Sequence, residues 1–268
     1  MNEPTKDTGT GENLKENSSN IKQKEQYNPP KNYAPKFISA IINWAEGLIE
    51  RYSVYGNPPI YDNSIFPWVR EVEEEWMKIR AELENVMQRR EELPNFHEIT
   101  SQAKPITNDN QWKTYMLAGY GLEGEMNSRS CPETARILKK IPGMKTAFFS
   151  ILSPNKHIPA HKGPYNGVLR YHLGLIVPEP QEQCRIRICD EIKHWEEGKS
   201  LIFDDTFNHE VWNDTSGFRA VLFVDFVRPL KFPINILNQF ILKAAIFTPV
   251  IREAADNYKR WEKRFYKQ

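Results

Sequence analysis

The segments HIPAHKGPYNGVLRYHLGLIVP (residues 157–178) and WEEGKSLIFDDTFNHEVWNDTSGFRAVLFVDFVRP (residues 195–229) decide the fold of this chain. In both, short runs of Val, Ile, Leu, Phe and Tyr are bounded by Gly, Pro, Asn and Asp, as in strands separated by turns. Regular spacing of this kind favours an antiparallel jelly roll over alternating strands and helices. We therefore expect a mainly β fold with flanking helices and with strands at 144–152, 168–177, 184–190, 200–203, 209–213 and 218–227.

Two histidines, His161 and His209, are interpreted as lying at strand ends, each beside turn residues. Histidines brought together from separate strands of a small barrel can hold one divalent metal. Iron oxygenases of the jelly-roll type usually add a carboxylate two residues after the first histidine, where this chain has Gly163. Judged from the residues alone, a histidine at a strand end is more often a hydrogen-bonded structural residue, so both interpretations stay open.

Several sequence blocks in a fixed order resolve this choice. They are H-x-G-P at 161–164, R-x-H-L-G-L at 170–175, W-E-E-G-K at 195–199, F-D-D-T-x-x-H-E-V-W at 203–212, and Arg219. Over roughly residues 60–230 the chain resembles the aspartyl/asparaginyl β-hydroxylase family, and it is also similar to bacterial lipid A acyl-chain hydroxylases. The resemblance implies a double-stranded β-helix (cupin-like) core and an Fe(II)- and 2-oxoglutarate-dependent dioxygenase that uses O2.

The same resemblance implies roles for individual residues. It makes His161 and His209 the iron ligands, with water filling the place that Gly163 leaves vacant. It assigns Ser150 and Arg219 to the distal carboxylate of 2-oxoglutarate. No further catalytic residue is implied beyond the metal centre.

Three other positions follow from the resemblance and from strand periodicity. Arg170 and His172 are two residues apart, so they share one strand face, and they are implied near the iron-chelating end of 2-oxoglutarate. Trp112 is expected in a strand at 111–117, either as a buried aromatic residue or, with Gly163, on the substrate side of the site. Trp195 and Trp212 are expected to be packing residues, and Asp204 and Asp205 to form a turn or to orient His209.

Composition sets the broad class of the protein. Its 268 residues, 40% hydrophobic and 26% charged, suit one soluble domain with appendages. A net charge of +1 gives no reason to expect nucleic acid as a partner. The odd cysteine count favours core thiols in a reducing compartment over a redox or metal pair. Because the N-terminus shows no apolar run typical of a secretory signal, we expect a cytoplasmic protein.

Four segments are expected along the chain. Residues 1–33 are polar and should be disordered, and residues 34–110 should form helices, at 35–51 and 64–92, that support the core. Residues 111–230 form the oxygenase domain, and residues 231–268 a helical C-terminal segment.

The C-terminal segment leaves its location open. Residues 232–251 are apolar, and the basic and aromatic residues that follow suit an anionic membrane interface. The segment could pack on the domain, touch a membrane through residues 232–268, or, least favoured, span one.

The substrate also stays open. Core similarity favours hydroxylation of the β-carbon of Asp or Asn in a peptide or protein. The alternative is a lipid-linked acyl chain of the lipid A or ornithine-lipid type, which the apolar C-terminus favours. A third hypothesis is a catalytically inactive cupin-like metal-binding sensor; the presence of Ser150, Arg170, His172 and Arg219 argues against it.

Overall fold

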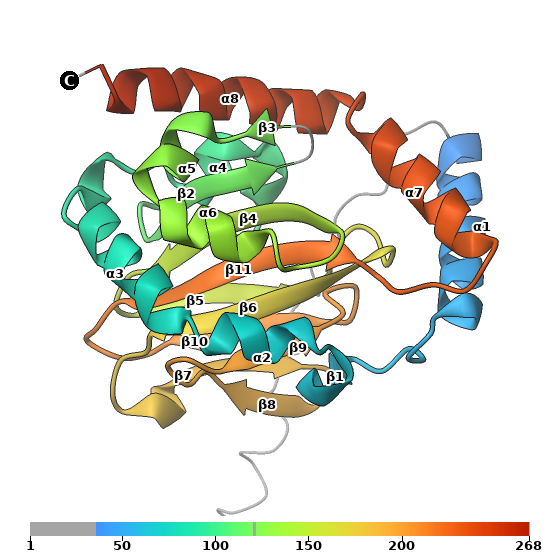
Figure 1. Cartoon of the computed structure of the whole chain (residues 1–268), viewed down its shortest axis with the longest axis horizontal. Helices are drawn as coiled ribbons and strands as arrows, with labels where there is room; N and C mark the ends of the chain where they lie inside the picture. Colours follow the sequence, from blue (N-terminus) through green and yellow to red (C-terminus); the bar gives the residue numbers. More distant parts are fainter. Residues whose placement is uncertain (1–35, 120–121, 268) are drawn as a thin grey trace, which may run out of the picture.

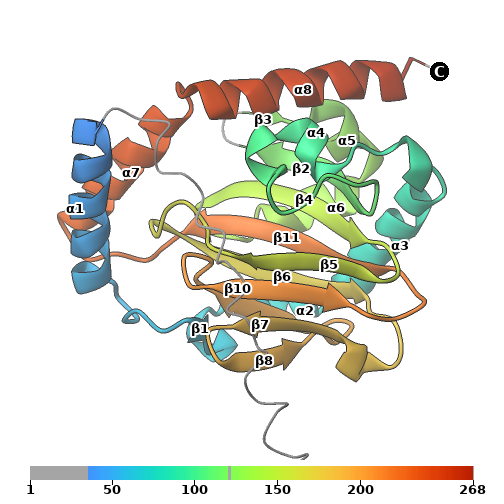
Figure 2. The same cartoon turned by 180° about the vertical axis from the view of Figure 1, so that it is seen from behind.

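Two antiparallel sheets form the centre of the molecule, seen from two sides in Figures 1 and 2. The computed structural model describes residues 36–119 and 122–267. The larger sheet has the order β1-β9-β6-β11-β4-β2-β3, and the smaller has the order β5-β10-β7-β8. The strands are β1 (Ile60–Tyr61), β2 (Trp112–Gly119), β3 (Leu122–Glu123), β4 (Met144–Leu152), β5 (Lys156–His161), β6 (Val168–Ile176), β7 (Cys184–Ile188), β8 (Glu191–His194), β9 (Ser200–Phe203), β10 (His209–Asn213) and β11 (Arg219–Val227).

The eight strands from β4 to β11 are divided between the two sheets in the manner of a double-stranded β-helix, alternating except for the neighbouring pair β7 and β8. Strands β4, β6, β9 and β11 belong to the larger sheet, and β5, β7, β8 and β10 to the smaller. Each ladder among them is antiparallel. The predicted jelly-roll core with flanking helices is therefore confirmed.

Six of these eight strands were predicted, and two were missed. The expected bounds of β4, β9 and β10 agree with the structure, whereas β5 and β8 were not expected. Pro159 in β5 explains one omission, because proline cannot donate to a strand ladder and is tolerated only at an edge. Strand β5 is indeed an edge strand of the smaller sheet.

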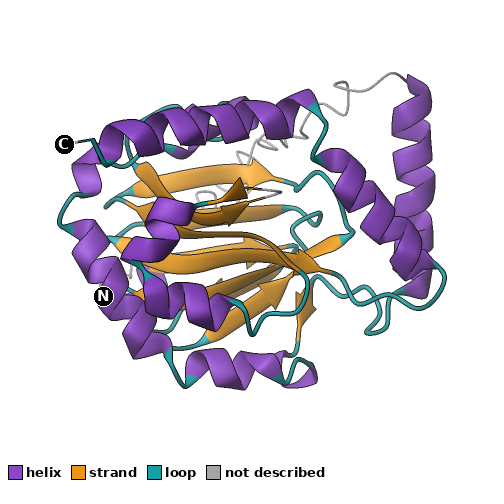
Figure 3. Cartoon of the chain, turned by 45° about the horizontal axis from the view of Figure 1, so that its top comes forward, coloured by secondary structure: helices purple, strands orange, loops and turns teal. Residues whose placement is uncertain are grey.

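Most helices cover the outer face of the larger sheet, and the first and seventh lie beside the sheets at one end of the molecule (Figures 1 and 3). The helices are α1 (Lys36–Tyr52), α2 (Trp68–Glu73), α3 (Trp76–Met87), α4 (Phe96–Ile99), α5 (Glu125–Ser130), α6 (Pro132–Leu138), α7 (Ile234–Ala245) and α8 (Pro249–Phe265), with short 3-10 turns at 63–65, 90–92, 101–103 and 181–183. The predicted helix at 64–92 is broken: Glu75 has φ −108° and ψ 9°, outside the helical region. Its apolar stripe nevertheless faces the sheet, since Val72, Ile79 and Leu83 are fully buried.

The C-terminal helix packs on the domain, which is one of the alternatives that the sequence left open. Tyr258, Trp261 and Phe265 of α8 are buried in the main hydrophobic core, so these aromatic residues serve packing within the protein. Among the described residues no single helix is long and apolar enough to cross a membrane. Helices α7 and α8 together meet the length and composition of a span, but they are bent by 55°. The expected tail at 1–33 lies outside the described residues.

All three cysteines are free thiols. Cys131 and Cys184 are buried, as expected of core residues, and Cys189 is half-buried. Burial raises the pKa of the Cys131 thiol to about 12, so it stays protonated near neutral pH.

A buried ion pair fixes the turn that leads into β10. The guanidinium of Arg228 contacts the carboxylate of Asp204, and both side chains are almost completely buried. Arg228 also donates to Asn57 Oδ1 (2.8 Å) and the Tyr61 hydroxyl (3.1 Å). The other carboxylate oxygen of Asp204 accepts from the Thr206 backbone N–H at 3.0 Å and from its hydroxyl. The turn chemistry expected of Asp204 is confirmed.

Replacing Arg228 with Met should destabilise the fold by ~3–5 kcal/mol, because Asp204 would remain buried without a counter-charge. Chemical denaturation followed by circular dichroism measures this change in the free energy of unfolding. As a matched control, Arg70→Ala removes an exposed pair with Glu74 and should cost less than ~0.5 kcal/mol. Equal effects of the two substitutions would contradict a structural role for the buried pair.

Candidate metal and cosubstrate site

His161 and His209 meet where two neighbouring strands of the smaller sheet face each other. Strands β5 and β10 are antiparallel, and their register places His161 directly opposite His209. The centroids of the two imidazole rings are 4.1 Å apart. The fold therefore brings together the two histidines that the sequence singled out.

Hydrogen bonds fix the tautomer of both rings. Nδ1 of His161 lies 2.8 Å from the carbonyl oxygen of Pro159, and Nδ1 of His209 lies 2.9 Å from that of Phe207. A carbonyl can only accept, so each Nδ1 carries the proton and each Nε2 keeps its lone pair. Burial lowers the pKa of both histidines, that of His161 to about 4, which keeps the rings neutral. Neutral imidazoles anchored through their second nitrogen are the form in which histidine binds metals.

A third protein ligand is missing from this pair. Within residues 36–119 and 122–267, no group of three His, Cys, Asp or Glu side chains is placed to hold a metal ion. At Gly163, a Cβ atom would overlap the carboxylate of Asp205. The Gly163 N–H also donates to the Asp205 carbonyl at 2.6 Å. The position where a third ligand would stand is thus filled by a neighbouring turn.

Substituting Gly163 with Ala should lower both stability and activity, because the new methyl group would push Asp205 away from Arg170. Overpacking of this kind costs ~1–3 kcal/mol. The matched control is Gly47→Ala in α1, where a Cβ atom meets nothing within 4 Å; it should be neutral or stabilising by up to ~1 kcal/mol. Thermal denaturation of both variants tests this, and an unchanged melting temperature for Gly163→Ala would contradict the crowding.

Arg219 places an unpaired positive charge between the two sheets. It begins β11 and is 2% exposed, and its Nε and Nη1 have no hydrogen-bond partner. None of the described carboxylates lies within ion-pair distance of it; its guanidinium instead lies 4.4 Å from the centroid of Trp195. Burial lowers the pKa of Arg219 to about 10, so it remains charged near neutral pH. A buried guanidinium is costly without an anion, which makes this a site for a carboxylate.

Further polar groups face the same interior without partners. His172 is 4% exposed, and neither of its ring nitrogens has a hydrogen-bond partner among the described residues. The indole nitrogen of Trp195 is also unsatisfied. Ser150 accepts a hydrogen bond from Trp112 Nε1 at 3.0 Å, which leaves the seryl O–H free to donate elsewhere. Such unsatisfied buried groups are rare in native proteins and indicate a bound ligand or ion.

Strand register explains why these residues meet. Val221 lies opposite Ser150 on β4, and Phe223 lies opposite His172 on β6. Side chains two residues apart share a face, so Arg219 points to the same side as Val221. The larger sheet therefore presents Ser150, His172 and Arg219 together on its inner face.

Arg170 is held by two carboxylates. Its guanidinium lies 2.8 Å from Asp205 and 3.0 Å from Asp225, and 4.2 Å from the centroid of Phe223. Asp225 is directly opposite Arg170 in the β6–β11 ladder. Burial raises the pKa of Asp205, and the charge of Arg170 opposes that shift. Arg170 thus braces the Asp205 turn beside His161, in addition to the cosubstrate contact predicted for it.

A cavity of about 140 Å³ opens at His161, one member of the histidine pair. His161, Gly163, Arg170 and Asp205 contribute its polar wall. Its apolar wall comes from aromatic and aliphatic side chains that include Phe96, Ile106, Trp112 and Phe223. Both residues predicted on the substrate side, Trp112 and Gly163, line this cavity. Sequence reasoning did not anticipate the wall formed by residues 96–106.

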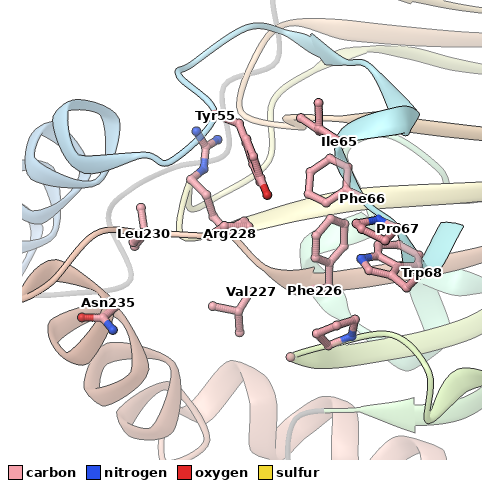
Figure 4. Close-up of a pocket in the computed structure, with 13 residues that line it drawn as sticks. Tyr55, Ile65, Phe66, Pro67, Trp68, Phe226, Val227, Arg228, Leu230 and Asn235 are labelled. Atoms are coloured by element: carbon pink, nitrogen blue, oxygen red, sulfur yellow. The ribbon is translucent and has the colours of Figure 1, made fainter.

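A second cavity, of about 410 Å³, lies on the other face of the larger sheet. In Figure 4 the rings of Phe66, Trp68 and Phe226 gather on one side of it, and Leu230 and Asn235 lie on the other. Arg228, already paired with Asp204, is the one charged residue among the described residues that line it. The described residues that line this second cavity include no pair of metal-binding side chains.

Trp195 has a larger part in the site than the packing role expected from sequence. The loop after Trp195 lies so close to β6 that a Cβ atom at Gly174 would overlap the Glu196 carbonyl oxygen. This close approach sets the indole against Arg219 and 6.0 Å from the His172 ring. The W-E-E-G-K motif marked Trp195 in the sequence, but the motif could not show which residues the indole contacts in the fold. Trp212, in contrast, packs outside this interior, stacked on His157.

Comparisons with known proteins show what this chain resembles. Residues 73–229 match the family model described as aspartyl/asparaginyl β-hydroxylase. An ornithine lipid ester-linked acyl 2-hydroxylase of Rhizobium tropici is 53% identical over 231 residues, which cover 86% of this chain and 82% of that protein. The human aspartyl/asparaginyl β-hydroxylase is 37% identical over 166 residues, 60% of this chain but 21% of that protein. A Pseudomonas putida prolyl-4-hydroxylase structure aligns with 57% of this chain and 87% of that one, at 17% identity and a TM-score of 0.38.

Proposed function

Because this chain belongs to the aspartyl/asparaginyl β-hydroxylase family, we propose that it is an Fe(II)- and 2-oxoglutarate-dependent hydroxylase of a lipid-linked acyl chain. The class of reaction follows from the family. The identity of the metal as Fe(II), of the cosubstrate as 2-oxoglutarate and of the substrate as a lipid is our proposal.

One observation carries the choice of a lipid. The likeness to the Rhizobium tropici lipid hydroxylase spans 231 residues, whereas the family model covers residues 73–229. That likeness therefore extends beyond the oxygenase domain into the flanking helices. The match to the human enzyme covers a shorter part of the chain. We propose an ester-linked acyl chain, hydroxylated at its 2-position, as the substrate.

The side chains of the interior suit the proposed cofactors. His161 and His209 would hold Fe(II) through Nε2, which their Nδ1 hydrogen bonds leave available. Arg219 and Ser150 would bind one carboxylate of 2-oxoglutarate, and His172 would donate to its other end. The anion would supply the partners that the buried nitrogens of Arg219 and His172 lack.

The remaining residues would bind and shield the substrate. When bound, Fe(II) with 2-oxoglutarate and O2 supplies the oxidising power that replaces a C–H bond by C–OH, while 2-oxoglutarate becomes succinate and CO2. Phe96, Ile106 and Trp112 form an apolar wall that suits an acyl chain and excludes water. Arg170 and Asp205 keep the turn beside His161 in place.

The test measures succinate release by the purified protein with Fe(II), 2-oxoglutarate and O2. One substrate set contains ornithine lipid in detergent, and a second contains peptides with Asp and Asn. We expect the lipid to stimulate succinate release and to gain the mass of one oxygen atom. Stimulation by the peptides alone would instead support the β-hydroxylation that the likeness to the human enzyme favours. Iron binding without any turnover would favour the sensor.

A further inference from the structure

Helices α1 and α7 pack on each other at one end of the molecule, beside the sheets (Figures 1 and 3). Ile49 of α1 forms a small buried cluster with Leu230 and Ile234, and Leu48, Tyr52 and Leu237 pack against it. This helix pair therefore has its own core. This core buries only part of the apolar surface of the two helices.

Large apolar side chains remain on the outside of this pair. Phe232, Phe247 and Phe240 are 75%, 70% and 69% exposed. Together with Trp44, Ile236 and Ile41, each more than half exposed, they form what we call the apolar patch. Soluble monomers rarely expose so many large apolar residues in one region unless a partner covers them.

The charges on the α7 side of the apolar patch are of one sign, whereas α1 also carries Glu46 and Glu50. Between residues 230 and 252 the charged residues are Lys231, Lys243 and Arg252, all basic and all exposed. Arg252 lies 5.9 Å from the ring centroid of Phe247. Exposed aromatic residues bordered by basic side chains complement an anionic bilayer surface, because rings enter the interface while Lys and Arg meet phosphate groups.

The loop that follows His161 is attached to this helix pair. The Tyr165 hydroxyl donates to Asn238 Oδ1 of α7 at 2.8 Å, and Asn238 Nδ2 donates to the Gly167 carbonyl at 2.8 Å. Asn166 donates to the carbonyl of Glu46 in α1 at 3.2 Å. The segment that carries a proposed iron ligand and lines the cavity thus continues directly into contacts with α1 and α7.

The larger cavity also adjoins the helix pair. Leu230 and Asn235 line its near side, and the aromatic rings of the domain line its far side (Figure 4). The cavity therefore lies between the helix pair and the body of the protein.

We propose that the apolar patch docks on an anionic phospholipid surface and so holds the mouth of the active site beside the membrane. This inference rests on the proposed function, because docking would bring the active site to a lipid substrate in the membrane. A symmetric second copy fits less well, because Lys231, Lys243 and Arg252 would face the same cations of the partner across a desolvated contact. Phosphate head groups would neutralise these cations.

Vesicle flotation of the full chain tests the docking. We expect binding to vesicles of phosphatidylcholine with phosphatidylglycerol, and much weaker binding to phosphatidylcholine alone. The double substitution Ile236→Glu and Phe240→Glu should lower the binding constant by roughly tenfold or more. Lys243→Glu should lower it by at least about fivefold on the anionic vesicles.

Two exposed apolar residues elsewhere give matched controls. Met77→Glu on α3 and Ile192→Glu on β8 change side chains that are 59% and 53% exposed, and both should bind vesicles as the unchanged chain does. If the patch double variant floats equally well, the docking site is wrong. If the chain is a dimer in analytical ultracentrifugation that only the patch double variant dissociates, a second copy covers the patch and the proposal is overturned.

Turnover separates this proposal from the proposed function. On lipid embedded in anionic vesicles, the turnover rate of the patch double variant should fall by the same factor as its vesicle-binding constant. On a short-chain lipid analogue dispersed in water, it should match the unchanged chain. Vesicle binding by the unchanged chain without lipid turnover would refute the substrate and leave the docking intact. Turnover of dispersed lipid without vesicle binding would refute the docking alone.

Discussion

Alanine at His161 or at His209 is expected to abolish metal-dependent turnover. Each imidazole would supply one of two protein ligands, because the described residues offer no third His, Cys, Asp or Glu at this place. The two rings lie close together, with centroids 4.1 Å apart. Loss of residues that merely orient a ligand typically costs 10–100-fold in metal affinity or activity, so loss of a ligand should exceed about 100-fold. Succinate release measures the activity. Anaerobic absorption of the complex with Fe(II) and 2-oxoglutarate measures the metal site independently.

His157 supplies the matched control for this prediction. It lies on β5 like His161, but its Nε2 contacts Glu210 at 2.7 Å and its ring stacks on Trp212. His157→Ala should therefore keep the absorption band and most of the activity. If both His161→Ala and His209→Ala keep the band, the assignment of the ligands is wrong.

Arg219→Met should have two effects of opposite sign. Without cosubstrate, removing a buried guanidinium that lacks a partner should raise stability by about 1 kcal/mol or more, since Met fills similar space without charge. The KM for 2-oxoglutarate should rise roughly 30-fold or more, because truncating one side of a buried charge pair costs ~2 kcal/mol or more. Thermal denaturation and initial-rate kinetics measure these two effects.

Ligand-dependent stabilisation sharpens the test at Arg219. Adding 2-oxoglutarate with a redox-inert divalent metal should raise the melting temperature of the unchanged chain and leave that of Arg219→Met nearly unaltered. Arg185→Met is the control, because that arginine is partly exposed, near Asp214 and over Trp212. An unchanged KM in Arg219→Met would show that the cosubstrate carboxylate is bound elsewhere.

Most strands could be predicted from sequence because their signals are local, whereas the histidine pair was predicted from the ordered motifs of the family resemblance. Alternating apolar residues and turn residues mark β4, β9 and β10 at the residues where the structure has them. Strand β5 carries Pro159 and few apolar residues, so its pairing with β10 depends on contacts distant in sequence. The helix break at Glu75 leaves the spacing of apolar residues intact and therefore has no signal in the periodicity.

The interior of the site was predictable only in part. The motifs identified His172, Arg219 and Ser150, but the placement of Trp195 over Arg219 depends on a loop that packs on another strand. The two carboxylates around Arg170 likewise come from distant segments, one on a turn and one on a neighbouring strand. The sequence left the partner of the C-terminal aromatic residues open, because amphipathic spacing cannot distinguish a protein core from a membrane as the apolar partner.

The crowding at Gly163 has an evolutionary consequence. Placing a carboxylate at that position alone would create a clash with Asp205. Removing the Asp205 carboxylate alone would deprive Arg170 of one of its two counter-charges. A lineage with this arrangement must therefore pass through an impaired intermediate before it can acquire a third protein ligand. The glycine and the aspartate are epistatic, and together they form a barrier that keeps descendants of this chain with two histidines.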